Sequence, residues 1–472
     1  MNYKNLDYVI YGTVNETEKI LMQLNCLKIA VKAIVVNDEV RSYKGNNDIS
    51  RFSKNQIIKF AADKNTCIIL SANNFGVFRA EICELCWEVR ACFIREIELF
   101  SHIVKASWNS NSCLINPIYS YDVMIGTQVG FVMGGLETWA TNLFHQLKSD
   151  GKRIAMIEPK QYSQYKYIGA ANYGISDNCV ISVGPFELFT DYIDTTLKLF
   201  CTRSPHIFVD NGSYRLLAAA WIAKKKLGVK MKVVSVVHNK ADISINRISI
   251  FKDIIDHIIV VSEEMHRIFC AQFPDMTDRI TCEIQTPRPC KTICRCLSNE
   301  PIRLAYVSRL EPENKRSLWV MDVINYLVSA NIRFELDIAG VGVCSTQIEK
   351  YISDNNYGEF VHYCGYIPYG RIFEFWKRHQ IFMNFSVAEG GPLTLLESMS
   401  QGVVPVVTRA GICPQLIHNG KNGFLINNPK DVAEIISILS KNRDLLDRVR
   451  NTSRETIQIL FDDNQKRHSE IF

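Results

Sequence analysis

The sequence predicts an α/β protein whose sheets are parallel. Short apolar runs recur along the chain, segments with helical spacing separate them, and polar or glycine-rich loops follow many of the runs. Strands that alternate with helices form parallel sheets, because each helix returns the chain to the start of the next strand. A length of 472 residues accommodates about three such domains.

The composition sets outer limits on function. No window holds the roughly 20 uninterrupted apolar residues of a membrane span. The first residues, MNYKNLDYVIYG, lack the charged segment and long apolar core of a signal peptide, so we expect a cytoplasmic protein. The net charge of +5 does not by itself indicate a partner, and we expect none that is a nucleic acid.

The cysteines lie mostly inside apolar runs such as CIIL and ACFI, where they are expected to be small buried side chains. Cys290, Cys294 and Cys296 form one cluster, PCKTICRC. No fourth ligand follows at the spacing of a zinc site, so we interpret this stretch as a linker rather than a metal centre.

Residues 1–105 are expected to form a small Rossmann-like accessory domain. Its first turn, YGTVNE, holds one glycine where a dinucleotide-binding turn would hold three, and Asp38 follows the second strand. These signals favour a structural role over nucleotide binding. The expected strands are Tyr8–Tyr11, Ala33–Val36, Cys67–Leu70 and Ala91–Ile94.

A second α/β unit is expected over residues 118–290. Gly134 and Gly135 precede a helix with an apolar stripe, and glycines allow a ligand to approach the backbone closely. Two later strands end in polar loops, one at Asp210–Ser213 and one at His238. Ligands of open parallel sheets bind beyond the carboxyl ends of the strands. For His238, contact with a substrate and simple capping of hydrogen bonds are equal alternatives.

A basic cluster ends one helix of this unit, Tyr214–Leu227, which reads YRLLAAAWIAKKKL. Lysines at a helix C-terminus offset the helix dipole, and we favour that interpretation. Contact of Lys224, Lys225 and Lys226 with anionic lipid is the alternative, and it would make the protein peripheral at the inner face of a membrane.

A third unit is expected over residues 300–465, after a linker at Cys282–Glu300. The loop after its first strand, SRLEPENKRSL, carries Arg309 and Lys315. Residues after about Leu445 are expected to form a polar helical tail.

The stretch FMNFSVAEGGPLTLLESMSQGVVPVV predicts a strand, a loop, a helix and a second strand. Gly390–Pro392 opens the helix and Gly402 ends it. A helix N-terminus binds phosphate well. Glu389 and Glu397 flank that end and suit the hydroxyls of the same ligand, and phosphate with many hydroxyls describes a nucleotide sugar. From this stretch alone, an ordinary acidic helix start is an equal alternative.

The order of these motifs resembles that of retaining glycosyltransferases with the GT-B fold. The resemblance covers residues 118 to about 465 and implies two Rossmann-like domains facing a cleft, with the acceptor side at 118–290 and the donor side at 300–465. The matching segments are GGLE at 134–137, VVHN ending at 239, SRLEPENK at 308–315, CGYIP at 364–368 and EGGPLTLLE at 389–397.

The resemblance also implies roles for single residues. Arg309 and Lys315 would grip the donor diphosphate, Glu389 would hold the transferred sugar, and His238 would lie next to it. Glu397 would accept hydrogen bonds from the ribose. The residues implied to bind the donor are Glu397, Gly390, Gly391, Leu393, Thr394, Tyr366, Gly134 and Gly135. Pro392 lacks an N–H, so one phosphate contact that the family often makes is absent.

The two cations have a physical purpose. Breaking the sugar–phosphate bond leaves charge on the diphosphate, and one cation about 4 Å away supplies roughly 4 kcal/mol at an effective dielectric near 20. We therefore expect no metal and no other cofactor. The sequence holds no Asp-x-Asp, the motif of metal-dependent transferases with the other common fold.

The resemblance implies transfer of a hexose-type sugar from a nucleotide-sugar donor to a glycan or lipid-linked glycan, with retention of anomeric configuration, as in bacterial surface polysaccharide synthesis. Two alternatives stay open. One is a nucleotide-sugar epimerase or a phosphorylase on the same fold. The other is a non-catalytic, transferase-like binding subunit.

Overall fold

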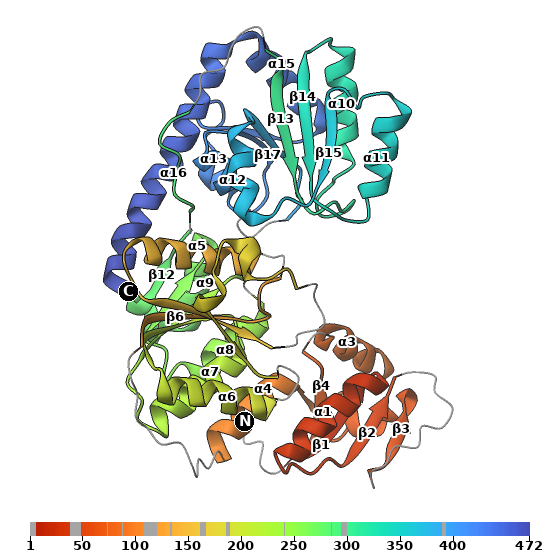
Figure 1. Cartoon of the computed structure of the whole chain (residues 1–472). Helices are drawn as coiled ribbons and strands as arrows, with labels where there is room; N and C mark the ends of the chain where they lie inside the picture. The colour runs from red at the N-terminus through yellow and green to blue at the C-terminus, as the bar shows by residue number, and fades with distance from the viewer. Residues whose placement is uncertain are drawn as a thin grey trace.

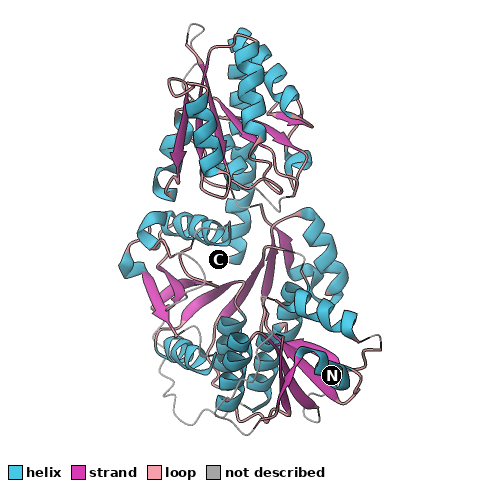
Figure 2. Ribbon diagram, turned by 90° about the vertical axis from the view of Figure 1, so that its right-hand side faces the viewer, coloured by secondary structure: helices cyan, strands magenta, loops and turns pink. Residues whose placement is uncertain are grey.

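The chain folds into three α/β units, each built around its own parallel sheet (Figure 1). The computed structural model describes residues 6–37, 49–72, 74–86, 88–107, 120–132, 135–160, 167–185, 189–239, 241–284, 286–293, 300–388 and 393–472. Helices flank the faces of the sheets (Figure 2), as expected when every strand-to-strand connection must cross a sheet face.

The first unit holds a sheet with the strand order β3-β2-β1-β4-β5. Its strands are β1 (Asp7–Gly12), β2 (Ala33–Val36), β3 (Arg51–Ser53), β4 (Thr66–Leu70) and β5 (Cys92–Arg95). Its helices are α1 (Val14–Cys26), α2 (Ile58–Ala61), α3 (Phe75–Leu85) and α4 (Glu96–Ser107). The predicted strands are confirmed, and β3 is an additional short strand at one edge. Asp38 lies outside the described residues.

The second unit holds a sheet with the order β12-β11-β10-β9-β6-β7-β8. Its strands are β6 (Tyr121–Thr127), β7 (Ile154–Pro159), β8 (Val180–Val183), β9 (Pro205–Asn211), β10 (Lys232–Val237), β11 (His257–Val260) and β12 (Ile280–Cys282). Its helices are α5 (Gly135–Ser149), α6 (Phe189–Thr202), α7 (Tyr214–Lys225), α8 (Asp242–Phe251) and α9 (Glu263–Gln272), with a short 3-10 turn at Ala170–Tyr173.

The third unit holds a sheet with the order β15-β14-β13-β16-β17-β18. Its strands are β13 (Ile302–Val307), β14 (Phe334–Ala339), β15 (Val361–Gly365), β16 (Ile381–Asn384), β17 (Val404–Thr408) and β18 (Phe424–Ile426). Its helices are α10 (Trp319–Ser329), α11 (Ser345–Asp354), α12 (Tyr369–Lys377), α13 (Leu393–Ser400), α14 (Cys413–Leu416), α15 (Pro429–Lys441) and α16 (Arg443–Ile471).

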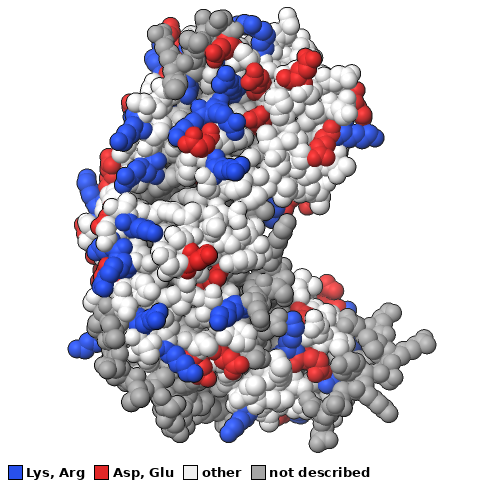
Figure 3. Space-filling view, viewed as in Figure 1, with Lys and Arg blue, Asp and Glu red and all other residues white. Residues whose placement is uncertain are grey.

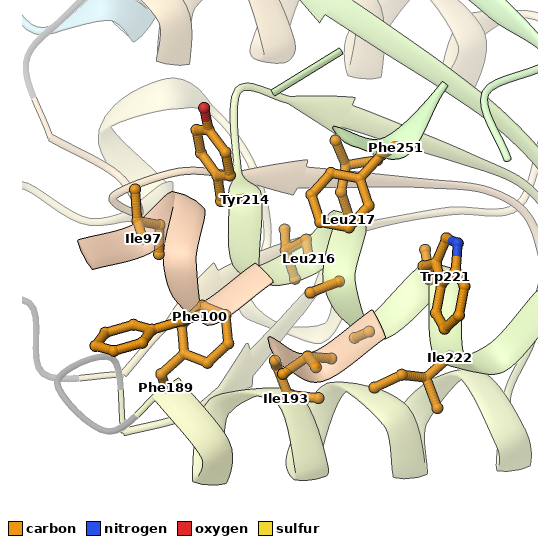
Figure 4. Close-up of a cluster of buried hydrophobic side chains, with 14 of the residues drawn as sticks. Ile97, Phe100, Phe189, Ile193, Tyr214, Leu216, Leu217, Trp221, Ile222 and Phe251 are labelled. Carbon is orange, nitrogen blue, oxygen red and sulfur yellow. The ribbon is translucent and has the colours of Figure 1, made fainter. Parts of the chain in front are cut away.

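The first two units share one hydrophobic core. Ile97 and Phe100 of α4 pack against Phe189 and Ile193 of α6, with residues of α7 on the other side (Figure 4). At the rim of this core, Lys105 Nζ lies 3.0 Å from Asp253 Oδ1. Because apolar surface is buried across the boundary, α4 joins the first sheet firmly to the second unit.

The last helix is not a solvated tail. α16 runs for 29 residues along one side of the molecule, from the third unit to the second (Figure 1). Its last residue, Ile471, is buried in the core of the second unit. His468 Nε2 lies 2.7 Å from Glu283 Oε1, and both side chains are buried. The expected polar helix after about Leu445 is confirmed, and a buried stripe within its polar sequence packs it against both units.

Two further findings bear on the sequence-based expectations. Within the described parts of the chain, no helix is both long enough and apolar enough to cross a membrane. No group of three or more His, Cys, Asp or Glu residues is placed to hold a metal ion there either. Cys290 is described and unpaired with another cysteine, whereas Cys294 and Cys296 lie outside the described residues.

Candidate active site

The second and third units meet where two helices begin. A Cβ atom on Gly135, the first residue of α5, would lie 3.9 Å from Cδ1 of Leu393, the first residue of α13. Each helix follows the carboxyl end of a parallel strand, which is where such sheets bind ligands. Two helix N-termini, each with partial positive charge, therefore face one space between the units. The surface of the molecule is hollowed below the third unit, which forms the upper part of the view (Figure 3).

His238 follows β10 and is held in one orientation. Its Nε2 lies 2.5 Å from Asn211 Oδ1, and Asn211 Nδ2 donates to the carbonyl oxygen of Leu136 at 2.9 Å. The amide oxygen of Asn211 thus faces the imidazole, so Nε2 of His238 carries the hydrogen. The edge of the ring packs against Trp139 at 5.6 Å between centroids.

The imidazole of His238 is neutral. Burial, together with the charge of Arg247, lowers its pKa to about 3. With the hydrogen on Nε2, Nδ1 is left as an acceptor, and among the described residues no hydrogen bond occupies it. The site therefore presents a fixed acceptor that suits a hydroxyl of a ligand.

A buried ion pair supports this arrangement. Arg247 of α8 pairs with Asp210 at the end of β9, and its Nη2 donates to Val236 O at 2.9 Å. Asp210 also accepts from Ser235 Oγ and from the N–H of Ser213, each at 2.7 Å. Burial raises the pKa of Asp210, while Arg247 and these hydrogen bonds favour the charged form. The strand ends that carry Asn211 and His238 are thereby locked together.

The cations of the third unit are exposed by comparison. The Arg309 side chain is 68% exposed and pairs with Glu311 at 3.1 Å. Lys315 is half-buried on the same loop, and its carbonyl oxygen accepts from the hydroxyl of Tyr306 at 3.1 Å. Ser317 Oγ donates to Arg309 O at 3.4 Å, which closes the loop on itself.

This basic loop is tied to the loop that leads into α13. The N–H of Val387 donates to Asn314 O at 2.8 Å, and the N–H of Ala388 donates to Asn314 Oδ1 at 3.2 Å. The two loops follow β13 and β16, which are neighbours in the sheet. The structure therefore places the segment of Lys315 beside the chain just ahead of Glu389.

A second contact packs the basic loop from the other side. A Cβ on Gly340 would lie 1.8 Å from the carbonyl oxygen of Ser308, and one on Gly342 would lie 2.3 Å from that of Leu310. No other residue fits at these two positions, because backbone meets backbone there. The glycines after β14 thus fix the course of the loop that bears Arg309.

Glu397 lies in the interior of the third unit. Its residue is 5% exposed, and burial raises its pKa to about 7. Burial raises the pKa of Tyr369, and the charge of nearby Glu397 raises it further. The carboxyl group therefore lies beneath the start of α12 rather than on open surface.

Of the remaining predicted site residues, some lie within the described parts of the chain and some lie outside them. Thr394 is half-buried on the first turn of α13, beside Leu393. Tyr366 follows edge strand β15, and β14 separates that strand from β13. Gly134, Glu389, Gly390, Gly391 and Pro392 lie outside the described residues.

Four residues that support the site carried no assignment from the sequence. Asn211 lay in a loop already noted for its polarity, and Asn314 lay in the EPENK segment. The signal for Arg247 was an arginine inside the apolar helix sequence ISINRISIF. Tyr306 offered no signal, because a tyrosine within a buried strand is common.

Comparisons with known proteins bear on the fold and on the third unit. Residues 301–442 match the family model described as Glycosyl transferases group 1. No curated protein sequence matches the chain.

Several solved structures resemble the chain. HepE of Anabaena, in complex with UDP and glucose, gives a TM-score of 0.54 at 12% identity, over 74% of this chain and 99% of HepE. The pneumococcal O-GlcNAc transferase GtfA, in complex with UDP and GlcNAc, gives 0.56 at 12% identity, over 75% of this chain and 99% of GtfA. The lipopolysaccharide outer core galactosyltransferase WaaB, in its apo form, gives 0.50 at 20% identity, over 72% of this chain and 95% of WaaB.

These likenesses show the fold, and the family match identifies its third unit. The two sheets that meet at α5 and α13 are the two halves of a GT-B fold, and the first sheet is an addition to it. Residues 301–442 thus match the group 1 glycosyl transferase model, within a chain that has the GT-B fold.

Proposed function

We propose that the chain is a glycosyltransferase that uses a nucleotide-sugar donor. The observation that carries this proposal is the meeting of the α5 and α13 helix starts, with the Arg309 and Lys315 loop bonded to the chain that leads into α13. Helix N-termini and nearby cations suit the diphosphate of such a donor. A group 1 glycosyl transferase domain in the same unit supports the assignment.

Each half of the cleft has its own task in this proposal. On the third unit, Arg309, Lys315 and the N–H groups at Leu393 and Thr394 take the diphosphate. On the second unit, Nδ1 of neutral His238 accepts a hydrogen bond from a hydroxyl of the transferred sugar. Glu397 accepts hydrogen bonds from the ribose after the donor displaces its present neighbours. Glu389, Gly390, Gly391, Gly134 and Gly135 are also proposed to bind the donor, and Tyr366 is proposed to border the base.

The reaction that fits these groups is transfer of a hexose-type sugar with retention at the anomeric carbon. The bond between that carbon and the diphosphate oxygen breaks, and its electron pair stays on the diphosphate. The acceptor hydroxyl attacks from the same face and passes its proton to a phosphate oxygen. Two cations at the leaving group do what a metal ion would otherwise do, so we expect no requirement for one.

The partners follow from the same reaction. HepE and GtfA were solved with UDP and a hexose or a hexosamine, which makes UDP-sugars the first donors to test. We propose a glycan or lipid-linked glycan as the acceptor, in bacterial surface polysaccharide synthesis. The place of reaction would be the cytoplasm or the inner membrane surface.

The test is nucleotide release from a panel of UDP-, GDP-, ADP- and CMP-sugars without acceptor, in the presence and absence of EDTA. We expect slow release from one donor, unchanged by EDTA and reduced in Glu397→Ala. The anomeric configuration of a transferred product, read by NMR, then tests retention. Neither release nor donor binding by any sugar nucleotide would contradict the proposal and favour a non-catalytic subunit. Conversion of a donor into an isomeric sugar nucleotide without acceptor would favour an epimerase.

A further inference from the structure

A cavity lies between the same two units, at the linker that joins them. Its volume is about 910 Å³, and it is lined by parts of α5, α12, α16 and the linker at residues 286–293. A volume of this size lies within the range of roughly 300–1,000 Å³ typical of small-molecule sites. None of Arg309, Lys315, His238, Glu397 or Leu393 lines it, so this hinge cavity is separate from the candidate active site.

Three residues on its wall hold buried polar atoms without a partner. Asn142 Nδ2, Gln146 Nε2 and Thr286 Oγ1 make no hydrogen bond, and their residues are only 7%, 7% and 2% exposed. The hydroxyl of Tyr369 donates to Asn142 Oδ1, which fixes that amide with its NH2 group left over. Each unpaired buried group costs about 1–3 kcal/mol, so such groups indicate a missing partner.

The charges on the wall have one sign. Arg288, Lys291, Lys377 and Arg450 line the cavity, and none of the described residues that line it is an Asp or a Glu. Arg450 is engaged with the carbonyl oxygen of Gly402, and Lys377 pairs with Glu374. Lys291 makes no hydrogen bond or ion pair with any described residue. A hollow with cations and hydrogen-bond donors but no carboxylate attracts an anion.

The apolar part of the wall is aromatic. Tyr173, Tyr369, Phe373 and Phe461 line the same cavity as the unpaired donors. Flat aromatic faces cover the apolar face of a ring well, whereas amide and hydroxyl donors meet ring hydroxyls. The wall therefore offers contacts to a ring, to hydroxyls and to negative charge at once.

We propose that the hinge cavity is a second ligand site, which takes a sugar that bears a phosphate or a carboxylate. Lys291 and Lys377 bind the anionic group, and the side chains of Asn142, Gln146 and Thr286 bind the hydroxyls. The ligand contacts both units and their linker, so it stabilises the placement of the units that forms the cavity. This site does not depend on the proposed transferase activity.

The test measures binding to the full chain by thermal shift and calorimetry. The probes are glucose 6-phosphate and glucuronate, with glucose and inorganic phosphate as controls. Gln146→Met removes the unpaired amide at similar size, and Lys291→Gln removes one charge. Arg309→Ala is the matched control in the other cleft.

We expect one of the two anionic sugars to stabilise the protein, and the effect to persist in Arg309→Ala. Binding weakens roughly tenfold or more in Gln146→Met and in Lys291→Gln, since each loses a hydrogen bond with the ligand. Without ligand, Gln146→Met melts at a higher temperature than the parent, because a buried unpaired amide has gone. That rise also shows that the variant is folded.

Three outcomes would overturn the proposal. Binding of neither anionic sugar would mean that water alone fills the cavity. Binding that is lost in Arg309→Ala but kept in Gln146→Met would place the sugar in the candidate active site. An equal shift with inorganic phosphate would show recognition of the anion alone and would remove the sugar from the assignment.

Discussion

The two halves of the candidate active site are built in opposite ways. On the second unit, His238 is held by Asn211, and the strand ends beneath it are locked by the buried pair of Asp210 and Arg247. On the third unit, the side chain of Arg309 is exposed, and only the backbone around it is fixed. The half on the second unit is therefore rigid and presents a neutral group to the ligand. The half on the third unit is adjustable, because its charged side chain is exposed.

The difference matches what each half has to bind. A sugar hydroxyl is recognised by a neutral acceptor at a fixed place, and prior fixation avoids an entropy cost when the ligand arrives. A diphosphate needs positive charge, and a cation kept in water until binding avoids the desolvation cost of an unpaired buried charge. The ion pair of Arg309 with Glu311 has to open for this purpose, and an exposed pair opens at little cost.

The largest effect is expected where the rigid half is broken. Arg247→Met leaves the fully buried carboxylate of Asp210 without its cation, and losses of about 3–5 kcal/mol are typical of such changes. Urea unfolding of the full chain measures the loss. Lys252→Met, which removes the exposed pair with Asp275, is the control and should cost less than about 1 kcal/mol. Equal losses in the two variants would mean that the second unit is not held by this pair.

The next effect concerns the adjustable half. Arg309→Ala should lower turnover about 100-fold or more, because one of the groups that stabilise the leaving diphosphate is lost. Its melting temperature should not change, since the side chain is exposed. Arg333→Ala is the control, an exposed arginine at the amino end of β14, away from the site. Turnover close to that of Arg333→Ala would contradict the role of Arg309.

Glu397 tests whether the third unit also contains a rigid part. Burial raises its pKa to about 7 from an ordinary value of 4.5, so the folded chain keeps this proton up to a higher pH than the unfolded chain does. The stability that the protonated group gives is complete below about 4.5 and is lost as the pH rises through about 7.

Glu397→Gln cannot ionise, so its stability relative to the parent should rise by about 2–3 kcal/mol between pH 5 and pH 8. Thermal and urea unfolding at the two pH values measure the change. Glu374→Gln removes an exposed carboxylate of the same unit and should show no such trend. A difference that stays constant with pH would place Glu397 in contact with water.

The sequence predicted the parts of the site that depend on local pattern. The loop of Arg309 and Lys315 and the start of α13 each follow an apolar run, and a buried run reveals the carboxyl end of its strand. Asn211 acts on His238 because β9 lies between β10 and β6, and no local pattern states that order. Arg247 reaches Asp210 from a different helix for the same reason.

Two elements show where local signals were weak or overlooked. Strand β3, Arg51–Ser53, is only three residues long, too short for an alternating apolar pattern to reveal it, and it pairs with β2. In α16 the buried positions include Ile457, Phe461 and Ile471, which recur at helical spacing within a polar sequence. The helical spacing of these apolar residues predicts a buried stripe, but it was overlooked because the segment as a whole is polar.

The smallest effect is expected for a hydrogen bond that holds the backbone of the basic loop, as distinct from the side chains of Arg309 and Lys315. Asn314→Ala removes the oxygen that accepts from the N–H of Ala388 and leaves the second bond between the loops intact. One hydrogen bond of this kind contributes about 0.5–1.5 kcal/mol, so turnover should fall about 3- to 10-fold while the fold persists. Asn419→Ala removes a similar bond, to the N–H of Leu425, elsewhere in the third unit and should leave turnover unchanged. If the two variants behave alike, the position of the basic loop does not depend on this link, and Arg309 and Lys315 bind the diphosphate without it.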